Sequence, residues 1–255
     1  PHFFAGFSGG GKLVFPGIAS LENIKEAHGY RILSHAKSTW GITHGNPVWE
    51  LLTEGARLTA PDFIVNVTLN SEKAITGVFA GELSAAHARG AEHAKQTAMR
   101  AVPERFDVVI TTNSGYPLDR NVYQTVKGIS AAASIVKDGG AIIAAAECID
   151  GIPAGSHFHR LLQRVGTPER ALELIASPGF SMQDQWQVQL QAEIQMRAEV
   201  YLYSHRLSKD EIRTTMLKPC DSIEDTLADL LQKYGPDASI CVLPDGPQTI
   251  PYVEA

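Results

Sequence analysis

A glycine-rich segment near the start of this 255-residue chain carries its most specific chemical pattern. The stretch Gly6-Phe-Ser-Gly-Gly-Gly-Lys12 satisfies the first seven positions of the phosphate-binding loop G-x-x-x-x-G-K. The eighth position needs a Ser or Thr hydroxyl for Mg²⁺, but Leu13 stands there, and Pro16 would end the helix that should follow. A glycine loop could still present backbone N–H groups to a phosphate. A tight turn packed on a neighbouring domain is the other interpretation, and both stay open.

Lys12 is a candidate nucleophile or covalent anchor. It lies between three glycines and the apolar run Leu13-Val14-Phe15, which could place its amine in a partly dry pocket. Desolvation lowers the pKa of a lysine and makes its amine more nucleophilic. An ordinary surface lysine is the alternative.

A second polar constellation spans residues 111–128. It follows the short apolar run Asp107–Thr111, which is typical of a buried parallel strand, and it leads into a helix. Ligands bind at such carboxyl ends of strands in open α/β sheets. Gln124 and Lys127 are three residues apart and therefore share one helix face, where an amide and an ammonium group suit a carboxylate ligand. A solvated helix face is the alternative for Lys127.

None of the nine histidines forms an HExxH motif or belongs to a CxxC…H site. A lone histidine is a weak signal for a metal. His2 and His28 become informative only because they flank the glycine-rich segment.

Two blocks of elements must position these residues. In the first block, to about residue 102, we expect helices over 21–30, 48–58 and 83–101 and paired strands over 63–69 and 75–80. From residue 103 onward the pattern alternates between strands and helices. Strands are expected over 107–111, 141–146, 200–203 and 239–243. Helices are expected up to 136 and over 156–165, 168–175, 185–197, 208–215 and 222–234. The alternation predicts an α/β fold whose C-terminal domain, 103–255, has a mainly parallel sheet flanked by helices.

The composition narrows the class of protein. A formal net charge of −6 argues against a dedicated nucleic-acid binder, and no apolar run approaches the ~18 residues of a membrane helix. The three cysteines, Cys148, Cys220 and Cys241, are too few for a disulfide scaffold and fit a reducing cytosol. We therefore expect a cytoplasmic protein that binds neither nucleic acid nor a membrane.

Three separated motifs together resemble one family. The segment from His2 through Lys12 to His28, with spacings of ten and sixteen positions, resembles the core motif of the nickel-pincer lactate racemase family. The stretch 114–128 resembles that family's C-terminal motif, and Asp184-Gln185-Trp186 resembles its later tryptophan segment. The resemblance implies a racemase or epimerase, an isomerase that acts on a lactate-like 2-hydroxy acid by proton-coupled hydride transfer.

The resemblance also implies how a cofactor is held. Lys12 would carry a nickel pincer nucleotide, a pyridinium mononucleotide with two sulfur donors, through a thioamide bond. Gly9 and Gly10 would adjoin this cofactor, and His28 would complete a planar nickel site, which suits Ni²⁺ with soft donors. Cofactor-synthesis proteins would supply the group.

The substrate residues follow from the same resemblance. His2 would be one of two acid/base histidines, Gln124 and Lys127 would hold the substrate carboxylate, and Trp186 would line the pocket. Family members carry a segment before the histidine motif with the partner histidine, and nothing here corresponds to it. We therefore expect residues 1–102 to be the later part of an N-terminal cofactor-binding domain. A P-loop-like nucleotide-binding protein without nickel and a non-catalytic α/β module remain the alternative functions.

Overall fold

A computed structural model of the chain describes residues 1–153 and 155–254. The chain divides into two compact units, Pro1–Arg100 and Ala101–Ala255. The division lies two residues before the domain boundary expected from the sequence.

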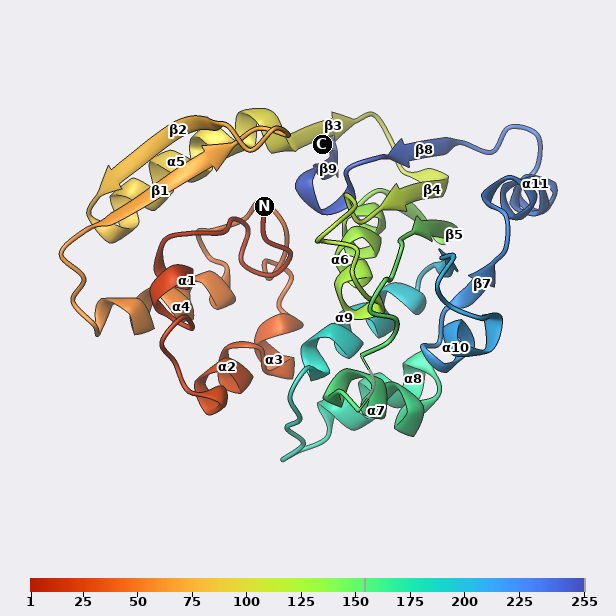
Figure 1. Ribbon diagram of the computed structural model, residues 1–255, viewed down its shortest axis with the longest axis horizontal. Coiled ribbons are helices and arrows are strands. Elements are labelled where there is room, and N and C mark those ends of the chain that lie inside the picture. The colour runs from red at the N-terminus through yellow and green to blue at the C-terminus, as the bar shows by residue number, and fades with distance from the viewer. Residues whose placement is uncertain (154, 255) are drawn as a thin grey trace. The chain divides into compact units, whose positions relative to one another are not determined.

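The first unit consists of short helices followed by a hairpin and one long helix (Figure 1). Side-chain caps explain where two helices begin: Ser20 accepts the Asn23 N–H, and Asn46 accepts the N–H groups of Val48 and Trp49. The helices are α1 (Gly11–Val14), α2 (Leu21–Ala27), α3 (Tyr30–Leu33), α4 (Pro47–Arg57) and α5 (Leu83–Ala98).

The hairpin strands β1 (Ile64–Leu69) and β2 (Ile75–Gly81) pair antiparallel, as the alternating sequence predicts. Helix α5 packs along both strands (Figure 1). On the strand face that points away from α5, most apolar side chains are exposed. Val67 of β1 and its partner Val78 of β2 are examples. Each strand therefore has one packed face and one uncovered face within this unit.

The second unit contains a five-stranded sheet in the order β7-β6-β5-β4-β8, and every neighbouring pair is parallel. This confirms the predicted α/β class with a mainly parallel sheet. Its strands are β4 (Phe106–Thr112), β5 (Val136–Ala145), β6 (Glu199–Tyr203), β7 (Lys218–Cys220) and β8 (Ile240–Leu243). A separate two-stranded sheet pairs β3 (Met99–Val102) with β9 (Ile250–Val253).

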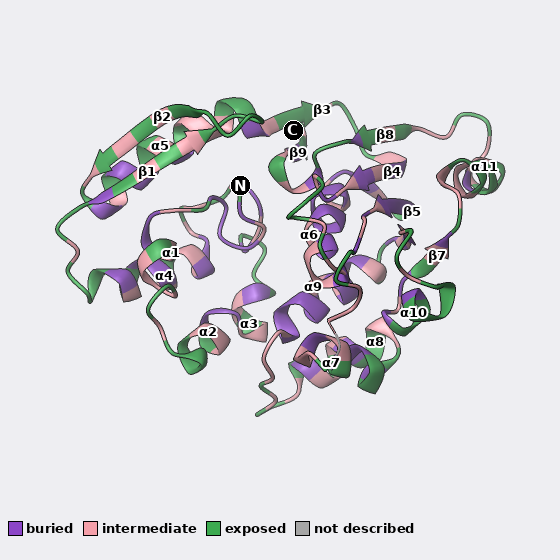
Figure 2. Ribbon diagram, in the orientation of Figure 1, coloured by how far each residue is buried: buried purple, intermediate pink, exposed green. Residues whose placement is uncertain are grey.

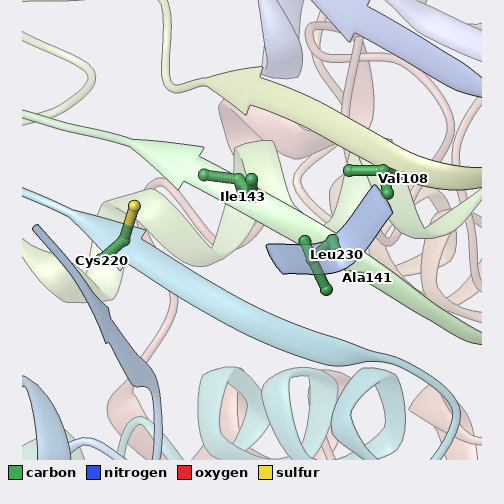
Figure 3. Packing of buried hydrophobic residues seen from close by; sticks show 5 residues of the cluster. All are labelled: Val108, Ala141, Ile143, Cys220 and Leu230. Carbon is green, nitrogen blue, oxygen red and sulfur yellow. The ribbon is translucent and has the colours of Figure 1, made fainter. Parts of the chain in front are cut away.

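Helices flank this sheet, and the buried residues follow its central strands and α6 (Figure 2). One core cluster joins β4, β5, β7 and α11 through Val108, Ala141, Ile143, Cys220 and Leu230 (Figure 3). The helices are α6 (Val122–Ala133), α7 (His157–Val165), α8 (Pro168–Ala176), α9 (Gln185–Gln195), α10 (Lys209–Thr214), α11 (Ile223–Tyr234) and the 3-10 turn η1 (Gly246–Gln248).

Some element ends differ from the expectation. The alanine-rich helix ends at Ala98 rather than 101, because Met99–Val102 forms a strand that pairs with β9. The helix expected to reach residue 136 ends at Ala133, and Val136 already opens β5. In both cases the helix ends where the chain begins to pair with a strand that is distant in the sequence. Local propensity does not reveal such pairing. Within the described residues, no helix combines the length and apolar character needed to cross a bilayer.

Candidate functional site

Lys12 and His28 both belong to the first unit, and the charge of Lys12 acts on the His28 ring. Lys12 is the second residue of α1, and burial lowers the pKa of its amine below the ordinary value. His28 caps the carboxyl end of α2. Its pKa is lowered to about 4, first by burial and further by the nearby Lys12 charge, although the bond to Ile24 opposes the shift. His28 is therefore neutral at pH 7, as a metal-ligating imidazole must be.

The hydrogen bond of His28 fixes its tautomer. The Nδ1 atom lies 2.9 Å from the carbonyl oxygen of Ile24, and a carbonyl can only accept, so Nδ1 carries the proton. The lone pair is then on Nε2. Ligating histidines commonly donate their other ring N–H to a backbone carbonyl in this way.

Each of the three consecutive glycines faces a polar side chain from a different element. A Cβ on Gly9 would lie 2.9 Å from Asn66 Oδ1 of β1, and one on Gly10 would lie 2.6 Å from His87 Cδ2 of α5. A Cβ on Gly11 would lie 3.2 Å from the Thr53 hydroxyl of α4. Glycine is thus required because the loop backbone approaches these neighbours closely.

Hydrogen bonds within the glycine loop show which of its backbone N–H groups are already engaged and so not available to a phosphate. The Gly10 N–H donates to Asn66 Oδ1 at 3.0 Å, and the N–H groups of Lys12 and Leu13 donate to the carbonyls of Gly9 and Gly10. Three amides that a cradle would offer to a phosphate are therefore already engaged. Helix α1 has only four residues and is followed by Phe15-Pro16. The loop is a packed turn, as in the second interpretation, but the side chains that it packs against, Asn66, His87 and Thr53, belong to its own unit and not to a neighbouring domain.

The Thr53 hydroxyl is a polar atom beside this loop that sequence reasoning missed. Thr53 is buried on α4, and its Oγ1 has no hydrogen-bond partner among the described residues. A buried hydroxyl without a partner costs free energy unless a water or ligand satisfies it. Its place next to Gly11 fits a polar group bound at Lys12.

His2 is buried at the start of the chain, and its Nδ1 accepts the N–H groups of Phe4 and Ala5 at 3.2 and 3.0 Å. The proton of neutral His2 is therefore on Nε2. To take up a second proton, the His2 ring must be protonated on Nδ1. The N–H groups of Phe4 and Ala5 point at this atom and therefore oppose its protonation. The expected acid/base role thus requires the ring to leave these two amides during the reaction.

In the second unit, Gln124 and Lys127 are two of the four half-buried positions of α6, whose other residues are buried. Asn121 caps this helix by accepting the Gln124 N–H at 3.0 Å. Trp186 of α9 is buried, and its Nε1–H donates to the Tyr123 hydroxyl at 2.8 Å. The structure therefore brings Trp186 to the residue beside Gln124. Tyr123 was not singled out from the sequence, because its role depends on contact between α6 and α9.

A cavity of about 320 Å³ lies at the carboxyl ends of β4, β5, β6 and β8, where ligands bind in open α/β sheets. Its lining includes Thr112 and Ser114 of the predicted polar loop, but neither Gln124 nor Lys127. The charged groups in its lining are carboxylates and a histidine, so it does not suit a carboxylate ligand. Gln124 and Lys127, which are expected to bind a carboxylate, therefore lie outside the lining of this cavity.

No group of three or more His, Cys, Asp or Glu side chains that could hold a metal ion occurs within residues 1–153 and 155–254. A site with one histidine ligand and the other donors from a cofactor needs no such group.

Comparisons with known proteins place these features in a family. The family model of the lactate racemase C-terminal domain matches residues 102–250, and that of the lactate racemase N-terminal domain matches residues 1–41. The chain belongs to the lactate racemase family. It is 36% identical over 253 residues to the lactate racemase of Thermoanaerobacterium thermosaccharolyticum, covering 98% of this chain and 59% of that protein. It is also 36% identical over 248 residues to the lactate racemase of Lactiplantibacillus plantarum, covering 96% and 58%.

Solved structures agree with this family. The lactate racemase apoprotein from T. thermosaccharolyticum superposes with a TM-score of 0.93 at 33% identity, covering 100% of this chain and 61% of that one. A Thermotoga maritima protein matches with a TM-score of 0.73 at 18% identity, covering 100% and 64%, which supports the fold alone. The chain spans about three fifths of the length of the family members that it matches.

Proposed function

We propose that the full-length protein interconverts the enantiomers or epimers of a lactate-like 2-hydroxy acid, as an isomerase that uses a nickel pincer nucleotide. Membership of the lactate racemase family supports the reaction class. The observation that carries the proposal is that one unit holds both the buried Lys12 amine and a buried His28 imidazole whose proton is held on Nδ1 by Ile24.

The residues of the first unit fit such a cofactor. Lys12 would hold it covalently, because a desolvated amine is a good nucleophile. The amine would attack the carbon of a thiocarboxylic acid group, so that the C–N bond of the thioamide forms as the C–O bond breaks and the oxygen leaves as water. His28 would ligate nickel through Nε2, since Ile24 holds the proton on Nδ1. The partnerless Thr53 hydroxyl beside Gly11 would donate to a polar group of the bound nucleotide. Gly9 and Gly10 would adjoin the cofactor through their peptide groups, because their Cα atoms face Asn66 and His87.

When bound, the cofactor supplies a reversible acceptor for the Cα hydride of the substrate, which avoids forming a carbanion beside a carboxylate. The chain's own residues bind and orient the substrate. Lys127 would pair with the substrate carboxylate while Gln124 hydrogen-bonds to it, holding the planar keto acid as it turns. Trp186 would form a pocket wall, held in place by Tyr123.

His2 would exchange the hydroxyl proton of the substrate through Nε2. For this exchange its ring must leave the amides of Phe4 and Ala5, which hold the resting tautomer. Positioned proton transfer of this kind contributes about 10²–10⁴-fold in rate. The cofactor would come from cofactor-synthesis proteins. The three free cysteines suit a reducing compartment, so we expect a cytoplasmic location.

A labelled substrate tests the reaction. The full-length protein, supplied with the nickel pincer nucleotide, is incubated with single enantiomers of several 2-hydroxy acids that carry deuterium on Cα. Chiral chromatography and mass spectrometry then follow both configuration and label. We expect inversion with deuterium retained, because the hydride returns to the same carbon. Loss of deuterium to water would contradict hydride transfer, and the absence of inversion with any 2-hydroxy acid would contradict the function.

A further inference from the structure

We propose that Asn66 and His87 are positioning residues that fix the glycine loop so that Lys12 is presented for covalent loading of the cofactor. This inference rests on the proposed function. Neither residue is expected to touch the substrate or the cofactor.

Asn66 holds the loop from β1. Its Oδ1 accepts the Gly10 N–H at 3.0 Å, and its side chain is also the one that Gly9 faces. Asn66 interrupts the β-branched run of β1, on the strand face opposite the exposed Val65 and Val67. Asparagine is unfavourable within a strand, so its place here is explained by the loop that it binds.

His87 holds the other side of the same loop from α5. The side chain is buried, and its Nε2–H donates to the Ser8 carbonyl at 3.1 Å. Its ring stacks on Trp49 at 6.0 Å and lies against the Cα atom of Gly10. The ring therefore has a fixed orientation, and it fixes the carbonyl that precedes the three glycines.

The two contacts act on successive parts of one short segment. His87 binds the carbonyl of Ser8, and Asn66 binds the amide of Gly10. The peptide groups before and after Gly9 are therefore both fixed. The carbonyl of Gly9 then accepts the Lys12 N–H at 3.2 Å and begins α1. The start of α1, and with it the backbone from which Lys12 extends, is set by β1 and α5. A reactive group held in advance on rigid elements loses less entropy when it forms its bond.

Paired variants of the full-length protein test this role. Asn66→Ala removes the acceptor for Gly10, and His87→Phe keeps a ring but removes the donor to Ser8. His87→Gln keeps a side-chain N–H of similar reach. Thr68→Ala is the matched control in β1, because it loses a hairpin hydrogen bond to Thr76 without touching the loop. Each protein is incubated with the nickel pincer nucleotide, and the mass adduct on Lys12 is followed with time by peptide mapping. Circular dichroism and hydrogen exchange of the loop amides are measured on the unloaded proteins.

We expect loading of Asn66→Ala and His87→Phe to be about fivefold slower, the factor that corresponds to one neutral hydrogen bond. Their loop amides should exchange faster while their circular dichroism stays unchanged. His87→Gln and Thr68→Ala should load at close to the wild-type rate. Normal loading of Asn66→Ala or His87→Phe despite faster loop exchange would overturn the positioning role, as would equally slow loading of Thr68→Ala. An absence of adduct on the wild-type protein would instead contradict the proposed function.

Discussion

At the scale of single residues, hydrogen bonds to the backbone decide where two histidines keep their protons. Ile24 holds the proton of His28 on Nδ1, whereas the amides of Phe4 and Ala5 hold that of His2 on Nε2. One imidazole thereby offers a lone pair and the other a proton at the same ring position. The lone pair on Nε2 of His28 suits a metal ligand, whereas His2 can take up a proton only after its ring leaves the amides of Phe4 and Ala5.

The proton-exchange role of His2 predicts a large kinetic effect without an effect on loading. His2→Gln keeps a side-chain N–H donor but cannot take up a proton. We expect kcat to fall by about 10²–10⁴-fold while the cofactor adduct on Lys12 still forms. Steady-state kinetics and peptide mapping check both. A kcat within a few-fold of wild type would mean that donation of a hydrogen bond suffices.

Nickel retention should depend on His28. His28→Ala removes the Nε2 ligand, and we expect the nickel content of the loaded protein to fall several-fold after desalting while the organic part of the cofactor stays on Lys12. Metal analysis and intact mass measure the two quantities on one sample. His35→Ala is the control, because that histidine is exposed. Full nickel retention in His28→Ala would remove His28 as the ligand.

At the scale of elements, one carboxylate ties strand β4 of the sheet to its two neighbours. Asp107 of β4 accepts hydrogen bonds at 2.8 Å from Lys137 of β5 and from the N–H and hydroxyl of Ser239, which precedes β8. The Lys137 contact, followed by the Ser239 bonds, lowers the pKa of Asp107 to about 2. The ionised form is therefore favoured in the folded state.

The lowered pKa of Asp107 fixes the sign of a pH dependence. Its contribution to stability is fully present above pH 4, and it is lost as the pH falls through the unfolded value near 3.8 toward about 2. We expect Asp107→Asn to lower the free energy of unfolding by about 1–2 kcal/mol at pH 7 and by less at pH 2. Denaturant unfolding at several pH values measures the difference. A deficit that is equal at both pH values would contradict the account.

The elements that the sequence predicts well are those with strong local signals. The strand Ile64–Leu69 alternates and is β-branched, and the helix Pro47–Arg57 opens with an Asn-Pro cap. The strand Lys218–Cys220 was not predicted, because three residues carry no periodicity and only pairing with β6 defines them. The strand Ile250–Val253 was missed for a similar reason, since it depends on pairing with β3.

The candidate site shows the same limit. Lys12 and His28 could be singled out because their spacing around a glycine run is a local pattern. Asn66, His87 and Tyr123 could not, because each matters through a contact with residues far away in the sequence. A polar residue inside the β1 run was the one visible signal for Asn66.

At the scale of the whole molecule, the proposed residues are divided between the two units. His2, Lys12 and His28 belong to Pro1–Arg100, whereas the carboxylate-binding pair of α6 and Trp186 belong to Ala101–Ala255. The first unit therefore carries the chemistry proposed for the cofactor, and the second carries the contacts proposed for the substrate. Activity should require both, while covalent loading should depend on residues of the first unit.

The adduct on Lys12 tests the central claim most directly. The full-length protein is incubated with the nickel pincer nucleotide, and intact mass and peptide mapping locate any added mass, with Lys12→Arg and Lys25→Arg as the test variant and its matched control. We predict one cofactor mass on Lys12 in the wild type and in Lys25→Arg, and none in Lys12→Arg, whose circular dichroism should match the wild type. An adduct that persists in Lys12→Arg, or a wild-type protein that gains no mass, would contradict the account.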